Sequence, residues 1–121
     1  MEKETKVFDS ELKILEILWS AGEMTAKDVA ARAASEAGWS KTTTYTVLKK
    51  CVEKALVRRS EPGFLCRPLV SREEVQRRET RELIDRMYGG SADRLVASLL
   101  EGRTLSAQEI DRLRALVEAL S

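Results

Sequence analysis

The sequence contains no histidine, only two cysteines and no long apolar run. The absence of histidine excludes the commonest general base of enzymes, histidine-dependent triads and histidine metal ligands. Two thiols are too few for a four-ligand zinc site, and neither a nucleophile–base pair nor a glycine-rich phosphate loop is visible. No segment approaches the roughly 20 apolar residues of a membrane-spanning helix, and no signal peptide follows the polar first residues. We therefore expect a cytoplasmic protein with no metal, no cofactor and no direct insertion into a membrane, which is not an enzyme.

Charge is abundant but unevenly distributed along the chain. The 21 basic and 20 acidic side chains leave a formal net charge of +1, which does not by itself indicate a nucleic-acid partner. Residues 41–67, however, hold seven basic and two acidic side chains, a local charge of +5, and the other 14 basic and 18 acidic side chains carry −4. The seven are Lys41, Lys49, Lys50, Lys54, Arg58, Arg59 and Arg67. This local excess predicts a positive surface that the net charge conceals.

Apolar periodicity and turn residues predict a definite order of elements before residue 71. The predicted elements are helices from Asp9 or Ser10 to Gly22, from Thr25 to Gly38 and from Ser40 to Lys54, and strands at 55–60 and 64–70 around a Glu61-Pro62-Gly63 turn. Three helices followed by a hairpin are typical of a winged helix-turn-helix. We therefore predict a DNA-binding domain of this type over residues 1–70.

Residues 71–121 read as three further helices with sparse apolar positions. Serines at 71, 91 and 106 are predicted to cap them. These helices are too few and too thin to bury themselves well, so their apolar stripes need another surface, for which a second copy of the chain is the favoured source. The predicted fold is mainly α with a small β-hairpin wing: a winged helix-turn-helix domain followed by a three-helix dimerisation region over residues 71–121.

The helix expected from Ser40 is the candidate recognition helix. Its spacing places Thr44, Val47, Leu48 and Cys51 on the inner face. The opposite face then carries Thr42, Thr43, Tyr45, Thr46, Lys49 and Lys50, and Lys41 at the start of the helix is a further candidate contact. Threonine hydroxyls and methyls suit base edges, and lysines suit phosphates. A solvated charged face on an ordinary helical domain is the alternative.

The two thiols are expected to be reduced and to play no chemical role. Cys51 should be an inert, buried side chain, whereas Cys66 lies in the second hairpin strand and should be the more accessible of the two. Trp19 and Trp39 are expected to be core residues.

The chain resembles the penicillinase repressor (BlaI/MecI) family of bacterial regulators over residues 8–120. The segments that carry the resemblance are Glu11–Trp19, Trp39–Thr43 with Thr46–Leu48, Arg67–Ser71 with Glu74, and Leu105–Ile110 with Leu113. No single segment is decisive, but their order, spacing and total length together are specific. The resemblance implies a homodimeric repressor whose winged helix binds a two-fold symmetric operator.

Residue roles follow from this resemblance. The DNA-facing positions of the family fall on Lys41, Thr42, Thr43, Tyr45 and Thr46, with Arg58 and Arg59 in the wing. The family's dimer contacts fall among Val75, Leu83, Met87, Leu95, Leu99, Ile110, Leu113 and Val117.

The resemblance also bears on the inducing signal. In antibiotic-responsive members a membrane-bound sensor metalloprotease signals cleavage of an Asn-Phe bond, which corresponds here to Ser98-Leu99 and differs at both residues. Copper-responsive relatives carry a cysteine-rich tail, whereas no cysteine follows Cys66 here.

The sequence thus favours a DNA-binding transcriptional repressor that covers a promoter as a homodimer and is released by an inducing signal. Two alternatives stay open. One is a small-molecule-responsive winged-helix regulator with an effector pocket between its domains. The other is a protein-interaction module whose basic face binds an acidic partner rather than an operator.

Overall fold

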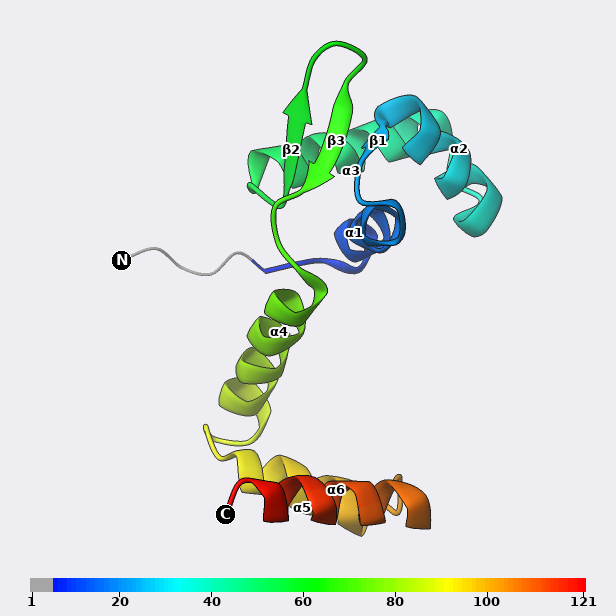
Figure 1. Cartoon of the computed structure of the whole chain (residues 1–121). Helices are drawn as coiled ribbons and strands as arrows, with labels where there is room; N and C mark the ends of the chain where they lie inside the picture. Colours follow the sequence, from blue (N-terminus) through cyan, green and yellow to red (C-terminus); the bar gives the residue numbers. More distant parts are fainter. Residues whose placement is uncertain (1–5) are drawn as a thin grey trace. The chain divides into compact units, whose positions relative to one another are not determined.

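Helices α1 (Asp9–Ala21), α2 (Ala26–Ala37) and α3 (Lys41–Glu53) pack against one another and against a small antiparallel sheet (Figure 1). The computed structural model describes residues 6–121, so the first five residues of the predicted domain 1–70 lie outside the described residues. The chain divides between Glu79 and Thr80 into two compact units, and this division falls within α4 (Arg72–Met87). Apart from the short strand β1 (Met24–Thr25), the elements of the first unit follow the predicted order.

Local capping explains where α2 and α3 begin. The Thr25 hydroxyl accepts a hydrogen bond from the backbone N–H of Asp28, and the Ser40 hydroxyl accepts one from Thr43. Each bond satisfies a donor that the first turn of a helix leaves free. Gly38 ends α2 in the left-handed conformation, at φ 69°, which glycine adopts without strain.

The sheet has the strand order β1–β3–β2 and contains one strand that the sequence did not predict. The strands are β1 (Met24–Thr25), β2 (Val57–Ser60) and β3 (Leu65–Pro68). In the β2–β3 hairpin, Arg58 lies opposite Arg67 and Arg59 lies opposite Cys66. β1 has only two residues, too few to show alternation, and it adds the segment after α1 to the sheet by pairing with β3.

The hydrophobic core of the first unit lies among α1, α2, α3 and the hairpin. Its fully buried side chains include Ile14, Leu15, Leu18, Val29, Leu48 and Leu56. Trp19 and Trp39, predicted to be core residues, are half-buried and pack against this core. The indole N–H of Trp19 donates a 2.8 Å hydrogen bond to the carbonyl of Val70, which fixes the chain just before α4.

The second unit, residues 80–121, contains the end of α4 followed by α5 (Ala92–Glu101) and α6 (Ala107–Ala119). A capping box at Ser106 and Glu109 begins α6, as the sequence predicts. Neither α5 nor α6 has a buried residue. Large apolar side chains are therefore exposed on this unit, namely Met87, Val96, Leu99, Leu100, Leu116, Val117 and Leu120. No helix among residues 6–121 has the length and apolar character needed to cross a bilayer.

Candidate nucleic-acid interface

Helix α3 has the two faces that its sequence predicts. Thr44, Val47, Leu48 and Cys51 are buried. The opposite side, here called the outer face, consists of Lys41, Thr42, Thr43, Tyr45, Thr46, Lys49 and Lys50. All of these side chains are exposed except Tyr45, which is half-buried. The residues predicted to contact DNA on this helix therefore lie together on one accessible surface.

An open hollow of about 440 Å³ lies on this outer face. Lys41, Thr42, Tyr45, Thr46 and Lys49 line it. Among the described residues, the ammonium groups of Lys41, Lys49 and Lys50 form no ion pair. The hollow is thus bordered by cations whose charges no neighbouring carboxylate of residues 6–121 offsets, an arrangement suited to a polyanion.

The threonines of this helix divide into two pairs. The Thr43 hydroxyl accepts a hydrogen bond from Ser40, and the Thr44 hydroxyl donates to the Ser40 carbonyl, so these two stabilise the start of α3. Within the described part of the chain, the hydroxyls of Thr42 and Thr46 have no such partner. Thr42 and Thr46 are therefore the threonines available to contact a ligand, whereas local capping explains the side chains of Thr43 and Thr44.

The wing, defined as β2, β3 and the turn 61–64, carries arginines on both of its faces. Arg58 and Arg67 lie directly opposite each other on the exposed face. Like charges in this position destabilise a strand pair, so the sheet gains nothing from keeping both. Arg67 was missing from the predicted DNA contacts. Strand alternation and the register of the hairpin together place Arg67 beside Arg58. The alternation can be read from the sequence, whereas the register is known only from the structure.

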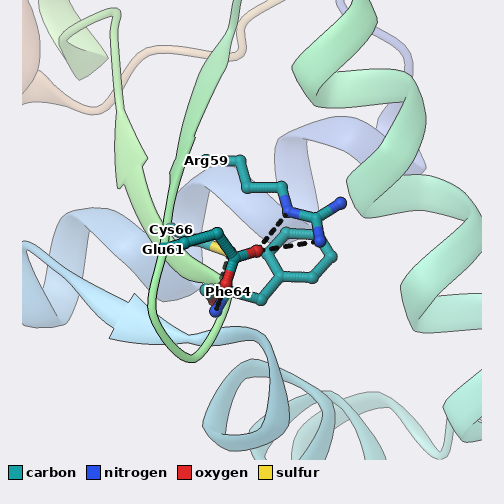
Figure 2. Close-up of polar contacts among 4 residues, drawn as sticks. All are labelled: Arg59, Glu61, Phe64 and Cys66. Atoms are coloured by element: carbon teal, nitrogen blue, oxygen red, sulfur yellow. Dashed lines mark hydrogen bonds and ion pairs between the residues drawn. The ribbon is translucent and has the colours of Figure 1, made fainter.

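Arg59 lies on the opposite face of the hairpin from Arg58 and Arg67. Its side chain makes polar contacts with Glu61 within the wing, as Figure 2 shows. Its Nε and Nη2 atoms donate hydrogen bonds of 3.0 and 2.9 Å to Oε1 of Glu61, and Oε2 of Glu61 accepts a 3.1 Å bond from the backbone N–H of Phe64. The Phe64 N–H and the Arg59 guanidinium lower the pKa of the Glu61 carboxyl. Arg59 therefore occupies a defined position before any ligand arrives.

Both thiols are buried and protonated at neutral pH. Burial raises the pKa of Cys51 to about 12 and that of Cys66 to about 11. The expectation that Cys66 is accessible is wrong. Cys66 lies in the central strand β3, which is flanked by β1 and β2, and its side chain is fully buried in the core. Among the described residues, no group of three or more histidine, cysteine, aspartate or glutamate side chains is arranged to hold a metal ion.

The residues predicted for dimerisation differ in how much of their surface is free. Met87, Leu99 and Val117 are exposed, and Leu83, Leu95, Ile110 and Leu113 are half-buried. Val75 is only 4% exposed and belongs to the core of the first unit, so its own chain already covers it. Ser98 and Leu99, the predicted cleavage position, are exposed in α5. Val96, Leu100, Leu116 and Leu120 are exposed as well; they belong to the apolar stripes predicted to need another surface, although the family resemblance did not name them as dimer contacts.

Comparison with known proteins places these features in a family. Residues 8–119 match the family model described as penicillinase repressor. The chain is 23% identical over 120 residues to the penicillinase repressor of Bacillus licheniformis, which covers 98% of this chain and 94% of that protein. It is 22% identical over 117 residues to the methicillin resistance regulatory protein MecI of Staphylococcus aureus strain N315, which covers 95% of each chain.

Two solved structures share the fold of the first unit. The solution structure of the DNA-binding domain of the repressor BlaI superposes with a TM-score of 0.55 at 21% identity, covering 61% of this chain and 93% of that one. The monomeric form of Bacillus licheniformis BlaI, solved in complex with the blaP half-operator, superposes with a TM-score of 0.53 at 21% identity and the same coverage. The predicted winged-helix fold is therefore confirmed, with β1 added to the hairpin.

Proposed function

Because the chain belongs to the penicillinase repressor family, we propose that it is a transcriptional repressor that binds double-stranded operator DNA as a homodimer. This family consists of repressors rather than enzymes, as the sequence predicts. The observation that carries the proposal is the outer face of α3, where cations without ion-pair partners among residues 6–121 surround side chains able to read bases. A protein-interaction module would need such a face only if its partner were also strongly acidic.

We assign the proposed base contacts and phosphate contacts to different residues of the outer face of α3 and the wing. Thr42, Tyr45 and Thr46 line the hollow and are proposed to read base edges in the major groove. The proposed phosphate contacts are Lys41, Lys49, Lys50, Arg58 and Arg59, to which the structure adds Arg67 as a candidate, and Thr43 supports the start of the helix. One helix contacts too few base pairs for selective binding, so two copies are needed.

The second copy is proposed to dock on the apolar surface of residues 71–121, while residues 1–70 serve the DNA. In the single chain, Leu116, Val117 and Leu120 are 65%, 58% and 88% exposed. Apolar side chains exposed together in this way mark an interaction surface. A dimer with two-fold symmetry then requires an operator whose two half-sites are related by the same symmetry.

Release is proposed to follow from loss of the dimer by mass action. A membrane-bound sensor metalloprotease that cut at Ser98-Leu99 would act in this way, because the bond lies in the exposed helix α5 and its cleavage separates α6 from the rest of the chain. A small effector that weakened the dimer would have the same result.

The phosphate contacts predict how salt affects binding. Replacing both Lys49 and Lys50 with alanine should reduce the slope of log affinity against log salt by about 3.6 for the bound dimer, because each lost phosphate contact removes about 0.9 and the two copies together lose four. The slope can be measured by fluorescence anisotropy on a 30-base-pair duplex of arbitrary sequence. Arg112→Ala with Arg114→Ala, an equal change of charge on α6, should leave the slope unchanged. A slope unaffected by the lysine substitutions would contradict the assignment.

A further inference from the structure

The turn of the wing is organised around one carboxylate. Oε1 of Glu61 accepts two hydrogen bonds from the Arg59 guanidinium, and Oε2 accepts one from the Phe64 backbone (Figure 2). Phe64 has φ 50°, a conformation uncommon for a residue other than glycine. The Glu61 side chain therefore fixes both the Arg59 rotamer and the backbone of the turn at Phe64. These three residues are called the wing cluster.

The wing cluster continues into the recognition helix through aromatic contacts. The Arg59 guanidinium lies 3.9 Å from the centre of the Phe64 ring, as expected for a cation–π contact. The Phe64 ring in turn meets the Tyr45 ring edge-on, with centres 6.1 Å apart and planes inclined at 71°. Tyr45 lines the hollow of the outer face. A continuous series of contacts therefore runs from Glu61 through Arg59 and Phe64 to Tyr45.

The charge of Glu61 is unfavourable for the proposed function if considered alone. Glu61 and Glu53 are the only acidic residues between Lys41 and Arg67. An exposed carboxylate beside a surface that binds phosphates repels them, so electrostatics alone predicts tighter DNA binding when Glu61 is neutralised. Its three hydrogen bonds distinguish Glu61 from Glu53, which is exposed and makes no such side-chain contact within residues 6–121.

We propose that Glu61 is a positioning residue for DNA binding, which favours binding despite its charge by holding Arg59 on Phe64 and Phe64 against Tyr45. The inference rests on the proposed function. Nη1 of Arg59 makes no hydrogen bond within residues 6–121, so it can donate to a phosphate while Glu61 holds the rest of the guanidinium. A side chain already fixed in the free protein loses less conformational freedom on binding, which strengthens the complex.

Glu61→Gln and Glu53→Gln test this inference because they change the net charge equally. Glutamine keeps the size of Glu61, but it loses the charge-assisted bonds and cannot accept from both Arg59 and Phe64 in the same way. Affinities are measured on the 30-base-pair duplex and on a duplex selected by the wild-type protein. We expect Glu61→Gln to weaken binding about 3- to 10-fold, whereas Glu53→Gln should leave it unchanged or make it slightly tighter.

A second pair of variants separates positioning from folding. Phe64→Leu should remove the ring contacts and weaken DNA binding as Glu61→Gln does. Phe64→Tyr keeps the aromatic ring and should bind DNA with wild-type affinity. In the free protein, the NMR chemical shift of the Arg59 Nε–H should change in the Glu61→Gln and Phe64→Leu variants and remain unchanged in the Phe64→Tyr variant. Melting curves of each variant verify that it folds.

The outcomes distinguish this inference from the function on which it rests. Wild-type protein that binds neither duplex overturns both. Wild-type protein that binds DNA, combined with Glu61→Gln binding as tightly as Glu53→Gln or more tightly, overturns the positioning role alone. Weakened binding by Glu61→Gln and by Phe64→Leu, with recovery by Phe64→Tyr, supports it.

Discussion

Replacing Leu116 and Val117 with aspartate should make the protein monomeric and lower its affinity for a duplex with two half-sites by at least about 100-fold. Both side chains are more than half exposed in the single chain, so their removal costs little packing within it. Two charges would instead face the partner copy, where they would lose water without gaining a counter-charge. Sedimentation measures the oligomeric state, and anisotropy measures the affinity.

The control for this experiment lies on the same helix. Gln108→Asp with Ala115→Asp adds the same charge to α6, on positions about half a turn away from the stripe of Leu113, Val117 and Leu120. This control should remain dimeric and keep its affinity. The dimerisation proposal is wrong if Leu116→Asp with Val117→Asp also sediments as a dimer, or if wild-type protein is monomeric at micromolar concentration.

The second large predicted effect concerns the free energy of unfolding rather than DNA binding, and it comes from the ion pair between Lys54 and Glu11. Nζ of Lys54 lies 2.7 Å from Oε1 of Glu11, whose side chain is 1% exposed. The same ammonium donates to the Lys6 carbonyl and lies 4.2 Å from the centre of the Phe8 ring. These contacts fasten the end of α3 to the start of α1, so they also hold the recognition helix in place.

Lys54→Met should therefore lower the free energy of unfolding by about 3 kcal/mol, because it leaves the Glu11 carboxylate buried without its counter-charge. We expect the lower end of the usual range, since Lys54 is 23% exposed on its side chain. In the variant, Oε1 of Glu11 would keep only the 2.9 Å hydrogen bond that it accepts from the Phe8 backbone N–H, and Oε2 has no hydrogen-bond partner among the described residues, so no second cation there replaces the lost charge. Urea unfolding is followed by tryptophan fluorescence, which reports only on the first unit because both tryptophans lie there.

Lys50→Met provides the comparison for Lys54→Met. Lys50 lies on the same helix, is exposed and has no ion pair within the described chain, so its replacement should change stability by no more than about 0.5 kcal/mol. Equal effects of the two substitutions would show that the buried pair does not fasten α3 to α1.

Much of helix α3, the candidate recognition helix, could be predicted because its pattern is local. The inner face of α3 follows from helical spacing, and its start follows from the capping serine at position 40. Glu11 was not singled out, although its spacing from Ile14, Leu15 and Leu18 places it on the buried face of α1. Its partner Lys54 is 43 residues away, so only the tertiary structure brings the two charges together.

The wing cluster and the position of Cys66 depend on strand register, which the sequence pattern did not determine. Arg59 and Cys66 share a face because they are paired across the hairpin, and β1 then covers β3 on its other side. The contact of Arg59 with Glu61 and Phe64 further requires the conformation of the turn at Phe64. The local charge and the family resemblance therefore placed Arg59 among the DNA contacts but did not identify its partners within the wing.

Selection of DNA from a random pool by the wild-type protein distinguishes a dimeric operator-binding repressor from a protein that binds no specific DNA. We expect enrichment of duplexes with two inverted half-sites whose centres lie about 10 base pairs apart or at a multiple of that distance, since a two-fold dimer presents both copies of α3 to one side of the DNA. The enriched duplex should lose affinity when Thr42 or Thr46 is replaced. Recovery of no preferred duplex, or of single sites without symmetry, would show that the protein does not bind an operator as a two-fold dimer.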